Sequence, residues 1–199
     1  MPLRFAPTAL PALLQSKLAR TTGHLAMIDR WNRDHADADP RWLAYMLDTA
    51  FHETGGTCRP LRETGAASDA AAILILERVF AAGRLPWVKA PYWRRDKAGK
   101  SWLGRGLVQI THRTNYARLG QAIGEDLISD PDRALDPEVA LNILFTGMID
   151  GLFTGKRLSD YFNPRRSDWT GARAIINGRE SAETVAGYAK AFYAALSQV

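Results

Sequence analysis

The chain has 199 residues, of which 46% are hydrophobic and 24% are charged, a composition typical of a soluble globular domain. Its 26 Lys and Arg residues against 21 Asp and Glu residues give a net charge of +5. This charge suits either an ordinary basic protein or attraction to an anionic surface such as cell wall, outer-membrane lipid or nucleic acid. The sequence has neither a nucleic-acid motif nor eighteen consecutive apolar residues. We therefore expect no nucleic-acid partner and no stable membrane insertion.

The cysteine content and the N-terminal residues indicate the cell compartment in which we expect the protein to fold. The single cysteine, Cys58, excludes an intrachain disulfide and fits folding in a reducing cytoplasm. The stretch from Met1 to Pro7 lacks the basic start and long apolar stretch of a secretory signal. We expect cytoplasmic synthesis without a signal peptide, so that a substrate outside the cytoplasm is reached through a pore or a secretion machine.

Three helices are predicted in the first third of the chain. Apolar residues recur at helical spacing from Leu10 to Leu18, with Thr8 as the expected N-cap, and again from Leu25 to Trp31. Asp39-Pro40 predicts an N-cap followed by proline at the first helical position. The helix that it opens ends at the double glycine 55–56, so Glu53 lies in its last turn.

The rest of the chain alternates helical signals with irregular stretches. Ser68 or Asp69 caps a predicted helix that Gly83 closes, and residues 85–106 are irregular, with the character of a lobe or long loop over a cleft. Val108 and Ile110 alternate with polar residues, which indicates a short strand. Further helical signals lie near Asn115, at Asp136-Pro137-Glu138, near Trp169, and from Ser181 to Leu196.

The first candidate site residue is Glu53, in His52-Glu53-Thr54-Gly55-Gly56. A carboxyl group buried by an apolar helix can hold a proton near neutral pH and donate it to a leaving oxygen. The alternative is a surface glutamate near a helix C-terminus. His52-Glu53 also begins a zinc-protease motif, but Gly56 stands where that motif has its second histidine. We therefore expect no metal site, and we interpret His52 as a packed or hydrogen-bonded helper.

The second candidate is Glu63, ten positions after Glu53 and beyond the double glycine. That offset allows the chain to double back so that the two carboxyl groups face each other across a cleft. An inverting glycosidase needs two carboxyl groups about 6.5–9.5 Å apart, with a water between them, and Glu63 would be the general base. The alternative is a solvated loop glutamate that pairs with Arg59 or Arg62.

The segment Gly104–Thr111 supplies further polar candidates. The Thr111 hydroxyl can hold the attacking water, and Gln109 can bind a sugar amide or hydroxyl; a strand threonine chosen for β propensity is the alternative for Thr111. Arg105 either pairs with a catalytic carboxylate or is a turn residue. Four aromatic residues of the irregular stretch are candidates for stacking on sugars, with one or two expected in the core: Trp87, Tyr92, Trp93 and Trp102.

The order of these motifs resembles that of glycoside hydrolase family 19. The segment Ala50–Thr57 resembles the first catalytic segment of the family, and Gly104–Thr111 resembles its Gly-Arg-Gly-x-x-Gln-[Ile/Leu]-[Ser/Thr] segment. Arg62-Glu63-Thr64 resembles the second-glutamate context of the phage-type branch. Asn115-Tyr116 and Ile175–Gly178 resemble the Asn-Tyr and Ile-Asn-Gly segments that line the cleft.

The resemblance implies a fold and a set of roles. The fold is mainly α, a lysozyme-like two-lobed domain with a central substrate cleft. We expect one catalytic domain over residues 1–199, in which N-terminal helices 1–38 pack on a core of residues 39–199. Glu53 is the implied general acid, Glu63 the base, and Thr111 the residue that orients water. The substrate-binding candidates are His52, Trp102, Arg105, Gln109, Asn115, Tyr116 and Asn177.

The predicted function is that of an endolysin-like hydrolase of phage or prophage origin that degrades peptidoglycan. It would cleave β-1,4 bonds between N-acetylated amino sugars with inversion. One alternative is a chitinase acting on chitin oligomers, and another is a non-catalytic wall-binding or virion structural protein. We expect a polysaccharide as partner, a monomer, and no cofactor.

Overall fold

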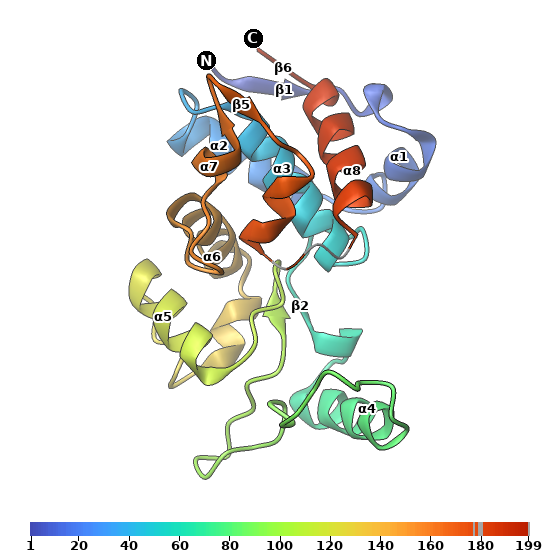
Figure 1. Cartoon of the computed structure of the whole chain (residues 1–199), viewed down its shortest axis with the longest axis vertical. Coiled ribbons are helices and arrows are strands. Elements are labelled where there is room, and N and C mark those ends of the chain that lie inside the picture. The colour runs from blue at the N-terminus through green and yellow to red at the C-terminus, as the bar shows by residue number, and fades with distance from the viewer. Residues whose placement is uncertain (177, 179–180, 199) are drawn as a thin grey trace. The chain divides into compact units, whose positions relative to one another are not determined.

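The computed structural model describes residues 1–176, 178 and 181–198 and divides into two compact units. The first unit comprises Met1–Arg59 with Leu144–Val199, and the second comprises Pro60–Ile143. Both consist mainly of helices with short strands, so the predicted mainly α class is confirmed (Figure 1). None of the described helices is both long and apolar enough to cross a membrane.

Helices α3 (Pro40–Glu53) and α8 (Ala182–Ala195) lie side by side in the first unit (Figure 1). The rings of Phe51 and Phe192 meet edge to face, 5.9 Å apart. Every side chain of α3 from Leu43 to Phe51 is buried, so this helix is a core element. The unit also contains α1 (Ala12–Leu18), α2 (Gly23–Asp34), α7 (Leu158–Tyr161), the 3-10 helix η4 (Gly171–Ile175), the antiparallel pair β1 (Leu3–Phe5) and β6 (Leu196–Gln198), and the antiparallel pair β4 (Phe162–Asn163) and β5 (Arg166–Ser167).

Local signals set both ends of α3, as predicted. The Asp39 carboxylate accepts the Arg41 N–H at 3.0 Å, which makes Asp39 the N-cap, and Pro40 stands at the first helical position. After Glu53 the chain turns through Gly55 and Gly56, whose φ angles are 63° and 98°. Only glycine adopts such angles without strain, so the helix ends here and leaves Glu53 as its last residue.

The second unit is built around a short antiparallel pair, β2 (Leu61–Arg62) and β3 (Arg105–Gly106). Helix α4 (Asp69–Ala81) packs through Ala72 and Leu76 on Trp93 and Leu103, which form a small core. Ser68 is its N-cap, because the Ser68 hydroxyl accepts the Ala71 N–H at 3.3 Å. The remaining elements are α5 (Arg113–Ile123), the 3-10 helices η2 (Glu63–Gly65) and η3 (Pro131–Leu135), and α6 (Pro137–Asp150), which contains the boundary with the first unit.

Three local predictions were wrong. Thr8 does not cap α1; it lies in the 3-10 helix η1 (Pro7–Ala9), and Pro11 is the N-cap. The strand predicted at Val108 and Ile110 is a tight turn, because positive φ angles at Gly106 (91°) and Gln109 (49°) bring Ile110 back to pair with Arg105. The helical signal near Trp169 corresponds only to η4, a 3-10 helix.

Candidate active site

In the first unit, the C-terminus of α3 presents Glu53 with its side chain about one-fifth exposed. The following turn is fixed by Thr54, whose buried hydroxyl donates to the Ala50 carbonyl at 2.6 Å and accepts the Cys58 N–H at 2.8 Å. The carboxylate of Glu53 accepts a hydrogen bond from Nη1 of Arg173 at 2.9 Å. The Glu53 carboxyl group is therefore fixed by a hydrogen bond from Arg173 and is still accessible to solvent.

Arg173 comes from η4 and is 5% exposed. It also lines a cavity of about 770 Å³ within the first unit, so the residue that holds Glu53 is part of the cavity wall. The rest of its described wall includes the polar residues Tyr161, Arg166, Asp168, Thr170, Ser181 and Glu183. His52 is half-buried on the last turn of α3. Asn177 lies outside the described residues.

In the second unit, Glu63 follows β2 and is held by uncharged donors. The Tyr92 hydroxyl donates to Oε1 of Glu63 at 2.7 Å, and the Gly104 N–H donates to Oε2 at 2.7 Å. The Glu63 N–H in turn donates to the Gly104 carbonyl at 2.7 Å. A Cβ at position 104 would lie 2.9 Å from the Gln109 amide oxygen and 3.3 Å from Glu63, so a side chain there would displace the Gln109 amide and crowd Glu63.

Three other predicted residues belong to the same unit. Gln109 has a positive φ, and its amide donates to the carbonyls of Leu61 and Gly106, so it fastens the turn to β2. The Asn115 amide donates to the Thr111 carbonyl at 2.8 Å. The Thr111 hydroxyl is partly exposed and makes no hydrogen bond within the described part of the chain, which leaves it available to a water molecule.

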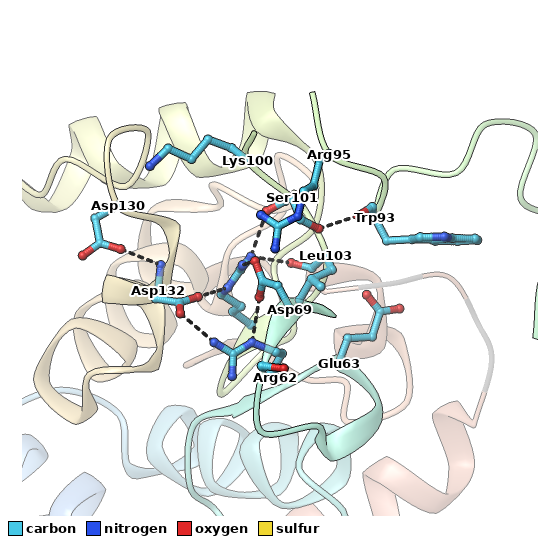
Figure 2. A network of polar contacts seen from close by, with 12 residues as sticks. Arg62, Glu63, Asp69, Trp93, Arg95, Lys100, Ser101, Leu103, Asp130 and Asp132 are labelled. Atoms are coloured by element: carbon cyan, nitrogen blue, oxygen red, sulfur yellow. Dashed lines mark hydrogen bonds and ion pairs between the residues drawn. The ribbon is translucent and has the colours of Figure 1, made fainter. Parts of the chain in front are cut away.

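Arg105 pairs with Asp69 and Asp132 and not with a candidate catalytic carboxylate, so the first of its two predicted roles was wrong. Its side chain is 1% exposed, with Nη2 2.6 Å from Asp69 and Nε 2.7 Å from Asp132. Arg62 contacts the same two aspartates at 2.8 and 2.6 Å, which closes a ring of two arginines and two aspartates (Figure 2). Arg62, one of the two alternative partners expected for Glu63, therefore pairs with these aspartates instead.

Tyr116 and Trp102 are also buried. The Tyr116 hydroxyl accepts from Nη1 of Arg105 and donates to the Leu103 carbonyl at 2.7 Å, and its side chain is 0% exposed. Trp102 is 7% exposed and donates to Asp96 at 3.0 Å. Arg105, Tyr116 and Trp102 thus support the segment that carries Gly104, and this burial argues against the direct sugar contacts predicted for them. Of the four aromatic candidates, Trp87 is 72% exposed.

Sequence reasoning missed the partners that hold both glutamates. Arg173 lies 120 positions after Glu53, and no local pattern connects them. Tyr92 was considered only for stacking, yet it is a direct hydrogen-bond donor to Glu63. Within the described residues, no three His, Cys, Asp or Glu side chains form a group that could hold a metal ion.

The sequence from residue 32 to residue 149 matches the family model of chitinase class I, glycoside hydrolase family 19. This match covers more than half of the chain and includes both glutamates and Gly104–Thr111. The protein therefore belongs to this family, and its mainly helical fold is the lysozyme-like fold of the family. The match ends before Arg173, which is therefore identified only from the structure.

Several curated relatives are plant proteins that match short segments. Chitinase 3 of Oryza sativa subsp. japonica is 49% identical over 49 residues, which are 24% of this chain and 15% of that protein. Lectin/endochitinase 1 of Urtica dioica is 60% identical over 35 residues, or 18% of this chain and 9% of that protein. Endochitinase of Pisum sativum is 59% identical over 34 residues, which are 17% of this chain and 11% of that protein. The chain thus spans a small part of these relatives.

Proposed function

We propose that this protein is a glycoside hydrolase that cleaves β-1,4 bonds between N-acetylglucosamine units, with chitin as the favoured polymer. The observation that carries the proposal is a pair of family-matched glutamates, each held by ordered donors: Glu53 by Arg173, and Glu63 by Tyr92 and Gly104. The named relatives are chitinases, which favours chitin over the peptidoglycan predicted from sequence.

The proposed mechanism is acid–base catalysis with inversion. Glu53 donates its proton to the glycosidic oxygen, so that the leaving sugar departs as an alcohol. Glu63 removes a proton from a water molecule on the opposite face of the sugar, and the free hydroxyl of Thr111 orients that water. Tyr92 and Gly104 fix the carboxylate that acts as base. The separation of the two carboxyl groups, on which inversion depends, stays a prediction.

Peptidoglycan is the second candidate polymer, because it has the same type of β-1,4 bond between N-acetylated sugars. The observation in its favour is Glu63 in an Arg-Glu-Thr context only ten positions after Glu53, the spacing that resembles phage-type members of the family. On this alternative, the protein acts on the cell wall after release through a pore or a secretion machine, as an endolysin does.

The test compares the two polymers with one protein. Wild type and Glu53→Gln are assayed on glycol chitin and on purified peptidoglycan, with products identified by mass spectrometry and the first-formed anomer by NMR. Wild-type cleavage of glycol chitin that disappears in folded Glu53→Gln supports the proposal, and the α anomer supports inversion. Cleavage of peptidoglycan alone would replace chitin with the second candidate. Binding without cleavage of either polymer would favour the non-catalytic alternative.

A further inference from the structure

Helix α4 is apolar on every side, yet most of it faces solvent. Ten of its 13 residues are apolar, and only Ala72 and Leu76 are buried. A helix of this composition is normally enclosed by protein or by lipid. At helical spacing, positions 71, 74, 75 and 78 form the stripe opposite the two buried residues, and all four are exposed. Leu74 is 53% exposed and Ile75 is 39% exposed, so the outer face of α4 presents apolar side chains to solvent.

The chain that follows α4 adds a further exposed apolar residue. It folds back beside the helix (Figure 1), and Leu85 and Val88 pack against the small core that α4 also covers. Trp87 lies between these two anchors and is 72% exposed. Among the tryptophans, all of which lie in the described residues, it is the only exposed one. A large aromatic side chain is thus held in solvent next to an apolar helix.

The same stretch contains the whole net charge of the protein. Residues 74–100 have seven Lys and Arg residues against two Asp and Glu residues, a net charge of +5, whereas the rest of the chain has 19 of each sign. Of the two acidic residues, Glu77 pairs with Arg94 at 2.8 Å. Four exposed cations make no ion pair or side-chain hydrogen bond in the part of the chain that the structure describes: Arg78, Arg84, Lys89 and Lys97.

The combination of apolar and positive side chains decides which partner this surface fits. Positive charge alone suits any polyanion, including nucleic acid, but Leu74 and Ile75 gain nothing from a polyanion in water. A second copy of the chain would bring the same positive charge to the contact, which disfavours self-association. An anionic bilayer stabilises both kinds of side chain. Its phosphates attract Lys and Arg, and its interface accepts apolar side chains and favours tryptophan.

We infer that residues 74–100 form a docking surface for an anionic lipid bilayer. Leu74, Ile75 and Trp87 enter the boundary between headgroups and acyl chains, and the unpaired cations contact the phosphates. The contact is peripheral and reversible, because α4 has 13 residues and a membrane-spanning helix needs about 20. Membrane binding is separate from hydrolysis, so this inference does not rest on the proposed function.

The charge dependence is tested by sedimentation with vesicles of phosphatidylcholine, with and without phosphatidylglycerol. Wild type is expected to bind only the vesicles that contain phosphatidylglycerol, and less as salt increases. Lys89→Gln with Lys97→Gln should weaken binding about fivefold for each charge removed. Lys156→Gln with Lys190→Gln removes the same charge from exposed positions of the first unit and should bind like wild type.

The apolar contribution is tested with a second matched pair of variants. Leu74→Ser with Ile75→Ser should weaken binding about tenfold, because side chains that leave water on docking are lost. The control is Leu13→Ser with Leu25→Ser, whose side chains are 54% and 44% exposed in the first unit, and it should bind like wild type. Binding should also shift tryptophan emission to shorter wavelength in wild type but not in Trp87→Phe.

Three outcomes overturn the inference. The first is no binding to vesicles that contain phosphatidylglycerol at low salt. The second is binding that Leu74→Ser with Ile75→Ser leaves unchanged and that duplex DNA competes away, which would make this a surface for polyanions. The third is a dimer in sedimentation velocity without vesicles that the same double variant abolishes, which would assign the apolar face to a second copy. None of these measurements uses hydrolysis, so they leave the proposed function to its own test.

Discussion

Glu53 and Glu63 are held by opposite kinds of partner. Glu53 accepts from the guanidinium of Arg173, whereas Glu63 accepts from the Tyr92 hydroxyl and the Gly104 N–H, which are both uncharged. The two arginines nearest to Glu63 in the strand pair, Arg62 and Arg105, are bound by Asp69 and Asp132 instead. A neighbouring cation stabilises a carboxylate and weakens it as a base, and in this ring the charges of both arginines are neutralised by aspartates.

The two units also differ in how well their buried polar groups are satisfied. In the second unit, Arg105 uses all three guanidinium nitrogens in hydrogen bonds or ion pairs. In the first unit, α3 buries polar atoms of Tyr45, Asp48 and Thr49 that have no hydrogen-bond partner among the described residues. A satisfied network specifies one geometry, and an unsatisfied one stores free energy that a function can use. The proposed base is thus next to a fully bonded network, and the proposed acid ends a helix whose buried polar groups lack partners among the described residues.

The largest expected effect separates the roles of the two glutamates. Glu53→Gln and Glu63→Gln should each lower kcat/KM on the natural polymer by about 10²–10⁴-fold, the usual contribution of general acid–base catalysis. An aryl glycoside whose leaving group needs no protonation should restore much of the activity of Glu53→Gln and none of that of Glu63→Gln. Equal rescue of both variants would contradict the assignment. Circular dichroism serves as the control for folding.

The next largest effect concerns the ring of ion pairs formed by Arg62, Arg105, Asp69 and Asp132. Arg105→Met removes a buried guanidinium and leaves the one-sixth-exposed Asp69 short of a partner, which is expected to lower the free energy of unfolding by about 3–5 kcal/mol. Arg94→Met breaks an exposed pair with Glu77 and should leave the urea midpoint unchanged. Similar midpoints for the two variants would show that the ring contributes little to stability.

Local structure around the site was predictable from sequence, but the partners of the glutamates were not. The ends of α3 follow from Asp39-Pro40 and the double glycine, because caps and glycine turns act within a few residues. Ser68 and Gly83 bound α4 for the same reason. Arg173 reaches Glu53 only through the tertiary fold, so no periodicity or motif reveals it.

The errors in the Gly104–Thr111 segment have a common physical cause. Leu107, Val108 and Ile110 are all buried. The alternation of apolar and polar residues that suggested a strand therefore reflects a turn whose apolar side chains are all in the core. Arg105 between two glycines has the sequence pattern of an exposed turn residue, and only the positions of Asp69 and Asp132 show that its charge is neutralised in the interior. Burial of a charged residue depends on its distant partners, which a single sequence does not identify.

A smaller effect is expected from Tyr92→Phe, which removes one uncharged donor from Glu63. A hydrogen bond to a charged group contributes about 1.5 kcal/mol at the low end, which corresponds to about tenfold in kcat/KM, with KM nearly unchanged. Burial raises the pKa of Tyr92, and its hydrogen bond to Glu63 adds to the rise, so the hydroxyl stays protonated to high pH. The loss should therefore be constant from pH 5 to pH 9. Tyr193→Phe is the exposed control, and a pH-dependent loss would contradict the role of an uncharged donor.

The smallest effect compares one helix cap from each unit. Asp39→Ala should lower the free energy of unfolding by about 1 kcal/mol or more, and Ser68→Ala by about 0.5 kcal/mol, as measured by urea denaturation. The order follows from the contacts. Ser68 makes one exposed bond of 3.3 Å, whereas Asp39 accepts both the Arg41 N–H and the Arg41 guanidinium, which also donates to the Asn163 carbonyl beside β5. Asp39→Asn keeps a capping oxygen and should recover part of the loss. If Ser68→Ala proved the more costly change, α3 would be held by apolar packing with α8 rather than by its N-cap.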